Sequence, residues 1–166
     1  MVEFTRYIIM GVSGCGKSTI GKVLASKLDI PFLEGDAFHP VENVEKMRAG
    51  TPLTNSDREA WIRDLSQAAN DIHGACVISC SALNQTVRNW IETQMSGVCQ
   101  FVLLEGKRDV LLSRLNNRED HFFNPDLLDS QLEALEVPAN ALRFNIGLTP
   151  DEISKQIIYK IPMKRG

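Results

Sequence analysis

A glycine-rich stretch near the N-terminus places the strongest constraint on the fold. The apolar run Tyr7–Met10 leads into Gly11-Val12-Ser13-Gly14-Cys15-Gly16-Lys17-Ser18, which matches the P-loop pattern G-x-x-x-x-G-K-[ST]. Glycines let successive backbone N–H groups curve around an anion, because no side chain blocks the approach. The apolar spacing predicts a helix over Lys17–Leu28, whose first N–H groups and positive dipole end would face the same anion. The sequence therefore predicts a strand, a phosphate-binding loop and a helix in direct succession.

The residue types in this loop predict ATP and Mg²⁺ as cofactors. Lys17 supplies a mobile cation for the β- and γ-phosphates, and the Ser18 hydroxyl is a ligand for Mg²⁺. Cys15 contributes its backbone N–H, and the positive charge around it predicts a reactive thiol without a catalytic role. The residues predicted to bind the nucleotide in this segment are Gly11, Val12, Ser13, Gly14, Cys15, Gly16, Lys17, Ser18 and Thr19.

Length and composition predict one ordinary globular domain spanning residues 1–166. Of the 166 residues, 43% are hydrophobic and 23% are charged. The net charge of −3 argues against broad binding to nucleic acids or anionic membranes. Because no basic segment followed by a long apolar run opens the chain, we expect a cytoplasmic protein. In that compartment, Cys76, Cys80 and Cys99 are expected to be reduced, buried thiols.

Short apolar runs alternate with amphipathic segments along the chain. Buried strands are expected at Arg6–Met10, Pro31–Leu33, Cys76–Cys80, Gln100–Leu104 and Leu142–Ile146. Helices are expected at Lys17–Leu28, Ser56–Ile72, Asn84–Met95 and Lys107–Asn117, and from Thr149 onward. Ser56 and Glu59 suggest a capping box for the second of these helices. The alternation predicts an α/β fold with a parallel sheet and helices on both faces.

Two acids follow the second predicted strand, in Leu33-Glu34-Gly35-Asp36. The carboxyl end of a parallel strand beside a phosphate-binding loop lies in the ligand crevice. There Asp36 would accept a hydrogen bond from a substrate hydroxyl and act as, or orient, the general base. Glu34 would hold a Mg²⁺-bound water. The alternative is a solvated turn in which neither acid has a chemical role.

Several segments, the P-loop among them, resemble the gluconate kinase family of small P-loop kinases. They are GVSGCGKST, GDAFHPVENVEKMRAGTPL, DREAW, CSAL, RLNNREDHFF and LLDSQLEALEVP, which together span most of the chain. The resemblance implies a three-layer fold like that of shikimate and nucleoside monophosphate kinases, with a short lid around residues 118–125. It implies transfer of the γ-phosphoryl group of ATP to the terminal hydroxyl of D-gluconate, giving 6-phosphogluconate. It also suggests a homodimer.

The same resemblance implies roles for individual residues. Asp36 would contact the reacting hydroxyl, His39 would line the acceptor pocket, and Arg58 would clamp the substrate carboxylate. Lid residues Arg114, Arg118 and His121 would contact the nucleotide, the transferring phosphoryl group and the substrate, respectively. Structural alternatives remain open for three of these residues: His39 would shape a turn before a proline, and Arg58 and Arg114 would lie on helix surfaces.

Among the departures from the family pattern, two bear on the chemistry. Asn84 stands where the family usually carries a lysine, and Asn55 stands where it carries an acidic residue. We retain Asn84 as a predicted substrate-binding residue, although an amide cannot replace a charge-assisted contact. The sequence thus leaves open a kinase for a related sugar acid or another small hydroxy acid. A second alternative is a regulatory protein that binds the nucleotide without catalysis.

Overall fold

Five strands form one parallel sheet in the computed structural model, which describes residues 3–117 and 125–161. The strands are β1 (Thr5–Met10), β2 (Phe32–Glu34), β3 (Cys76–Ser79), β4 (Val98–Glu105) and β5 (Leu142–Asn145). Their order across the sheet is β2-β3-β1-β4-β5, so the P-loop strand β1 lies at the centre. The predicted parallel sheet is confirmed, and each predicted strand overlaps an observed one.

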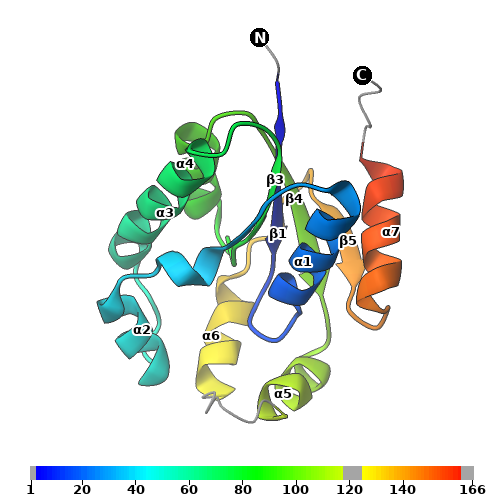
Figure 1. The fold of residues 1–166 in the computed structure, drawn as a ribbon. Helices are drawn as coiled ribbons and strands as arrows, with labels where there is room; N and C mark the ends of the chain where they lie inside the picture. Colours follow the sequence, from blue (N-terminus) through cyan, green and yellow to red (C-terminus); the bar gives the residue numbers. More distant parts are fainter. Residues whose placement is uncertain (1–2, 118–124, 162–166) are drawn as a thin grey trace.

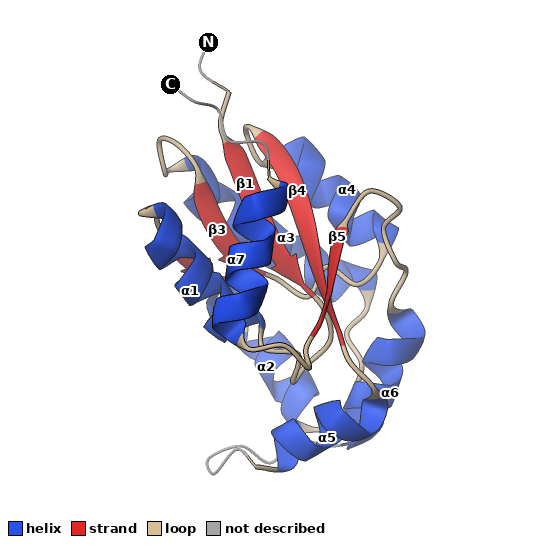
Figure 2. Ribbon diagram, turned by 90° about the vertical axis from the view of Figure 1, so that its right-hand side faces the viewer, coloured by secondary structure: helices blue, strands red, loops and turns tan. Residues whose placement is uncertain are grey.

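Helices cover both faces of the sheet, as the alternation predicts. In Figure 2, α1 (Lys17–Leu28) and α7 (Pro150–Lys160) lie in front of the sheet, and α3 (Asn55–Asn70) and α4 (Gln85–Gln94) lie behind it. The helices α2 (Val41–Arg48), α5 (Arg108–Asn116) and α6 (Pro125–Ala134) lie toward the carboxyl end of the sheet, in the lower part of Figure 1, and η1 (Gly35–Phe38) directly follows β2. No helix within the described ranges is both long and apolar enough to cross a membrane.

The core consists of two apolar layers, one on each face of the sheet. Ile9, Val77 and Val102 belong to the layer that contains buried residues of α1 and α7. Their neighbours Ile8, Ile78 and Leu103 belong to the layer that contains α3 and α4. Because successive side chains of a strand point to opposite faces, a strand covered on both sides is apolar at every position. This arrangement explains the continuous apolar runs in the sequence.

The start of α3 differs from the prediction. The capping box is formed by Thr54 and Asp57, and the box expected at Ser56 and Glu59 is wrong. The Thr54 hydroxyl accepts from the Asp57 N–H at 3.2 Å, and the Asp57 carboxylate accepts from the Thr54 N–H at 2.9 Å. Lys46 also donates to Asp57, and these hydrogen bonds lower the pKa of Asp57 to about 2. By contrast, the predicted start of α7 is confirmed, with a capping box formed by Thr149 and Glu152.

Three observed helices were not predicted: η1 and α2, which lie between β2 and α3, and α6. The sequence signals for α2 are weak: the proline before Val41, an acid at Glu42, and basic residues at Lys46 and Arg48 in the last turn. For this reason no helix was predicted in this polar segment, which is flanked by proline and glycine.

The cysteines are free thiols, as expected. Cys76 and Cys80 are buried, whereas Cys99 is only half-buried, so the expectation of full burial is wrong for Cys99. Burial raises the pKa of Cys80 to about 12 and that of Cys99 to about 11.

A buried arginine joins the segments at the amino end of the sheet, opposite the P-loop. Arg6 is completely buried in β1. Its guanidinium donates to the carbonyl oxygens of Ile72, Gly74 and Ser96, at 3.2, 2.8 and 3.1 Å. It also lies 4.5 Å from the centre of the Phe4 ring. These bonds hold the segments that lead into β3 and β4 against β1.

We expect Arg6→Leu to lower the free energy of unfolding by about 2–4 kcal/mol, because three carbonyl oxygens would lose a charged donor that is itself completely buried. The measurement is urea denaturation. The matched control is Arg63→Leu, at an exposed position of α3, which should change the stability by less than about 0.5 kcal/mol. Equal losses in the two variants would contradict a bridging role for Arg6.

Candidate active site

The loop after β1 has the geometry of an anion cradle. Gly14 and Gly16 have φ angles of 86° and 93°, a region that disfavours side chains. A Cβ atom at Gly11 would lie 2.8 Å from the carbonyl oxygen of Leu104. α1 begins at Lys17, and no side chain caps its N-terminus. The first N–H groups of the helix are therefore available to an anion.

A cavity of about 100 Å³ lies in this cradle. It is lined by Ser13, Gly14, Gly16, Lys17, Ser18, Thr19 and Asp36. Ser18 supplies a hydroxyl and Asp36 a carboxylate, which are the oxygen ligands that Mg²⁺ prefers. Lys17 supplies a cation whose Nζ lies 3.2 Å from the Val12 carbonyl oxygen. This donor set fits a phosphate chain with Mg²⁺.

The remaining three loop residues lie beneath this surface. Gly11, Val12 and Cys15 are buried, and none of them lines the cradle cavity. Cys15 is completely buried, with its sulfur 4.0 Å from the Nζ of Lys17. The expected reactive thiol is therefore not accessible in this structure.

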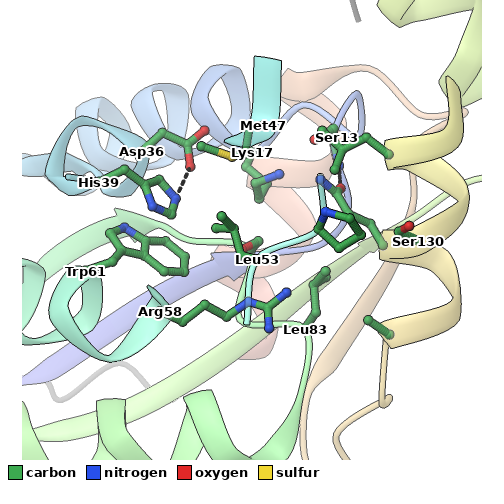
Figure 3. A pocket seen from close by; sticks show the side chains of 15 residues that line it. Ser13, Lys17, Asp36, His39, Met47, Leu53, Arg58, Trp61, Leu83 and Ser130 are labelled. Atoms are coloured by element: carbon green, nitrogen blue, oxygen red, sulfur yellow. Dashed lines mark hydrogen bonds and ion pairs between the residues drawn. The ribbon is translucent and has the colours of Figure 1, made fainter. Parts of the chain in front are cut away.

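A larger cavity of about 230 Å³ adjoins the cradle. Ser13, Lys17 and Asp36 line both cavities, so the two spaces meet at these residues. Figure 3 shows this larger cavity with Asp36, His39 and Trp61 on one side and Ser13 and Ser130 on the other. The remaining lining residues are Met47, Pro52, Leu53, Arg58, Ser81, Leu83, Leu127, Gln131 and Ala134. We call it the acceptor cavity.

The two acids after β2 occupy different environments. Asp36 lies in η1 and keeps 65% of its side chain exposed, facing both cavities. Glu34 accepts a hydrogen bond from the Ser79 hydroxyl at 2.8 Å and lines neither cavity. Gly35 separates them, and a Cβ atom there would overlap the carbonyl oxygen of Ser79. This close backbone contact determines where the Asp36 turn begins.

His39 is a buried, neutral side chain at the edge of the acceptor cavity. Its imidazole stacks on Trp61 with ring centres 4.0 Å apart, and only 3% of the side chain is exposed. Burial lowers the pKa of His39 to about 4; Asp36 opposes this shift, and Arg58 adds to it. The imidazole therefore carries one proton at neutral pH.

Asn43 determines which nitrogen of His39 carries that proton. The Asn43 amide is buried, and its Nδ2 donates to the Asp57 carbonyl oxygen at 2.9 Å. The same Nδ2 lies 3.2 Å from Nδ1 of His39. An NH₂ group can only donate, so Nδ1 accepts and the proton lies on Nε2. Nε2 lies 3.8 Å from an oxygen of Asp36.

Asn84 and Asn55, which depart from the family pattern, contact each other beside Arg58. Nδ2 of Asn84 donates to Oδ1 of Asn55 at 3.3 Å, and the Arg58 guanidinium donates to the same oxygen at 3.5 Å. Oδ1 of Asn84 accepts from the Val87 N–H at 2.9 Å and so caps α4. Asn84 does not line the acceptor cavity, whereas Arg58 does.

Arg114 lies on the other side of the P-loop. It donates to the Ile146 carbonyl oxygen at 2.7 Å and borders a second cavity of about 100 Å³. That cavity also includes Gly16, Thr19, Ile20, Leu148, Pro150 and Ile153. An apolar cleft with a guanidinium at the edge of the cradle suits a nucleotide base. Arg118, His121 and most of the expected lid segment lie outside the described residues.

The α6 residues Leu127, Ser130 and Gln131, and Trp61 of α3, line the acceptor cavity although no site role was predicted for them. The α6 segment carries part of the family resemblance, but its spacing gives no sign that it faces the P-loop. Trp61 is buried in the core, and it also lines the acceptor cavity and donates to the Gly35 carbonyl oxygen at 2.8 Å.

Comparison with known proteins identifies the family. A family model described as shikimate kinase matches residues 13–146. The chain is 42% identical over 165 residues to a probable gluconokinase of Dictyostelium discoideum, covering 90% of this chain and 82% of that one. It is 39% identical over 135 residues to the thermoresistant gluconokinase of Escherichia coli, covering 80% and 77%. The crystal structure of a gluconokinase from Sinorhizobium meliloti superimposes with a TM-score of 0.84 at 36% identity, covering 93% of this chain and 90% of that one. Its P-loop, its parallel sheet and these relatives together show that the chain belongs to the gluconokinase family of P-loop kinases.

Proposed function

We propose that this protein transfers the γ-phosphoryl group of ATP to the terminal hydroxyl of D-gluconate, giving 6-phosphogluconate and ADP. The observation that carries the proposal is the meeting of the two cavities at Ser13, Lys17 and Asp36. A phosphate chain in the cradle and a small acceptor in the larger cavity would meet beside one cation and one carboxylate. The gluconokinase relatives support gluconate as the acceptor.

Arg58 and Asp36 would orient the acceptor from opposite ends. Arg58 is the arginine of α3 that reaches into the acceptor cavity, and a guanidinium matches the two oxygens of a carboxylate. Asp36 would accept the hydrogen bond of the terminal hydroxyl. Such a pair favours a substrate with an acid at one end and an alcohol at the other.

The chemical step requires little from the protein beyond position and charge. The hydroxyl oxygen would form a bond to the γ-phosphorus as the bond from that phosphorus to the β–γ bridging oxygen breaks. Asp36 would take the hydroxyl proton, and Lys17 with the loop N–H groups would stabilise the phosphate charge. Mg²⁺, when bound near Ser18, would neutralise further phosphate charge.

His39 would act as a neutral hydrogen-bond donor. Its Nε2–H faces Asp36 at the cavity edge, while Trp61 and Asn43 fix the ring. A donor at this place can bind an acceptor hydroxyl oxygen without adding a positive charge beside Asp36. The carboxylate then keeps its affinity for the reacting proton.

A coupled assay of ADP release tests the proposal. D-gluconate should support turnover, whereas glucose, which lacks the carboxylate, should not. Turnover with another sugar acid alone would favour the related-acid alternative. ATP binding without turnover on any acceptor would favour the regulatory alternative. The homodimer and the cytoplasmic location remain predictions, and sedimentation velocity would test the former.

We expect Arg58→Gln to raise the KM for gluconate at least about tenfold, because the substrate carboxylate would lose a charge-assisted contact. The KM for ATP should change less than about twofold, since Arg58 does not line the phosphate cradle. Steady-state kinetics measures both values. Arg63→Gln, on an exposed position of the same helix, is the control. An unchanged KM for gluconate in Arg58→Gln would remove Arg58 from the acceptor site.

We expect Asn43→Asp to raise the pKa of His39 from about 4 toward neutrality, because a carboxylate beside Nδ1 stabilises the charged imidazole. The measurement is an NMR titration, which also reports that Nδ1 is unprotonated in the parent protein. The gluconate kinetics should show a new dependence on pH near the raised pKa. Asn89→Asp, at an exposed position of α4, should leave the titration of His39 unchanged.

The parent protein should also lose stability as the pH falls from about 6.5 to about 4. In this range the unfolded chain binds a proton at His39 and the folded chain does not, so the free energy of unfolding decreases with falling pH. His39→Gln should flatten that part of the profile. A pKa of His39 near 6.5 in the folded protein would contradict the burial of its imidazole against Trp61.

A further inference from the structure

One N–H group of the P-loop is already bonded to a side chain. The Ser13 N–H donates to Oε1 of Gln131 at 2.7 Å. These residues are 118 positions apart, and Gln131 comes from α6. In a loop whose N–H groups bind phosphate oxygens, a side-chain oxygen on one of them occupies a place that a ligand would take.

Ser13 lies at the end of the cradle nearest to the acceptor. It lines both cavities, whereas Gly14, Gly16, Ser18 and Thr19 line only the cradle. On the proposed function, the terminal phosphate of ATP must reach the junction of the two cavities for transfer. The Ser13 N–H therefore faces the position of the γ-phosphate, and the other loop N–H groups face the phosphates behind it.

The helix that carries Gln131 is held in place by contacts on both sides. Asp129 of α6 forms a two-pronged ion pair with Arg108 of α5, at 2.6 and 3.0 Å. After α6, the Glu136 N–H donates to the Leu83 carbonyl oxygen at 2.7 Å, and buried Arg88 donates to the Glu136 carbonyl oxygen at 2.7 Å. α6 thus presents Gln131 to the P-loop from a fixed position.

From these contacts we infer that, in the nucleotide-free protein, Gln131 accepts the hydrogen bond of the Ser13 N–H, which is the P-loop N–H that would bind the γ-phosphate. ATP must therefore displace Gln131 from this N–H. The inference rests on the proposed function, because it assigns the γ-phosphate to the Ser13 N–H. A phosphate oxygen carries charge and forms a stronger hydrogen bond than an amide oxygen, so ATP can win this competition. ADP, which lacks the γ-phosphate, leaves the contact intact. Gln131 therefore lowers the affinity for ATP relative to ADP. Its displacement by the γ-phosphate also breaks a contact between the P-loop and α6.

The test compares the dissociation constants of a non-hydrolysable ATP analogue and of ADP by calorimetry. Gln131→Ala should bind the analogue about threefold to tenfold more tightly, since the loss of one net hydrogen bond no longer opposes binding. Its affinity for ADP should remain within about twofold. Gln131→Glu should bind the analogue at least about tenfold more weakly, because its carboxylate bonds the Ser13 N–H more strongly and repels phosphate.

Glu133→Ala, on the exposed side of the same helix, is the matched control and should leave both affinities unchanged. Weaker binding of the analogue to Gln131→Ala would show that Gln131 is a ligand of the bound nucleotide, and would overturn the inference. Equal binding would show that the contact has no effect on ATP, with the same consequence. If the parent protein bound neither nucleotide, the proposed function would fail first, so the two failures are distinguishable.

Discussion

The backbone ladder between β1 and β3 is the interaction on which the rest of the site depends. Ile9 pairs with Ser79 in this parallel ladder, and the Cys80 N–H donates to the Ile9 carbonyl oxygen at 3.0 Å. One residue beyond β1, the Gly11 N–H donates to the Ser81 carbonyl oxygen at 3.3 Å. The ladder therefore aligns the start of the P-loop with the segment that lines the acceptor cavity. From β3, the Ser79 hydroxyl accepts from the Gly35 N–H and donates to Glu34, which fixes the turn that carries Asp36. The pairing of β1 with β3 and the hydrogen bonds of Ser79 thus determine how far the Asp36 carboxylate lies from the phosphate cradle.

Charge around this junction is arranged so that few groups compete for the same partner. Lys17 lines both cavities, whereas Arg58 lines only the acceptor cavity. His39 stays neutral between them because burial outweighs the attraction of Asp36. The contact of Asn84 with Asn55 is also neutral, because two amides meet beside Arg58 without adding charge. Among the described residues, Asp57 is the carboxylate that attracts the Arg58 guanidinium. Asp57 itself bonds Lys46 and the Thr54 N–H at the start of α3.

The parts of the structure that could be predicted carry local signals. The limits of α1 coincide with the prediction because its apolar stripe and the preceding glycines mark both the loop and the helix. The start of α7 is marked by a threonine cap, a proline and two acids within four residues. The failures also have local reasons. Thr54 and Ser56 are both good caps, and the box at Thr54 is supported by Lys46 of α2, which also bonds Asp57. Cys99 appears apolar in the sequence but lies near the open start of β4, where the burial of that strand is incomplete.

By itself, the sequence determined the P-loop, the buried parallel strand before it, the alternation of strands and helices, and Lys17, Ser18 and Asp36 as residues of one site. These features follow from backbone geometry and burial, which act over a few neighbouring residues and leave a pattern in the chain. The tertiary structure alone decided the strand order, the stacking of His39 on Trp61, the contact between Asn84 and Asn55, and the bond from the Ser13 N–H to Gln131. Each of these joins segments from 22 to 118 residues apart through a single side chain or one pairing choice. Such contacts depend on the path of the whole chain, and for that reason no local pattern encodes them.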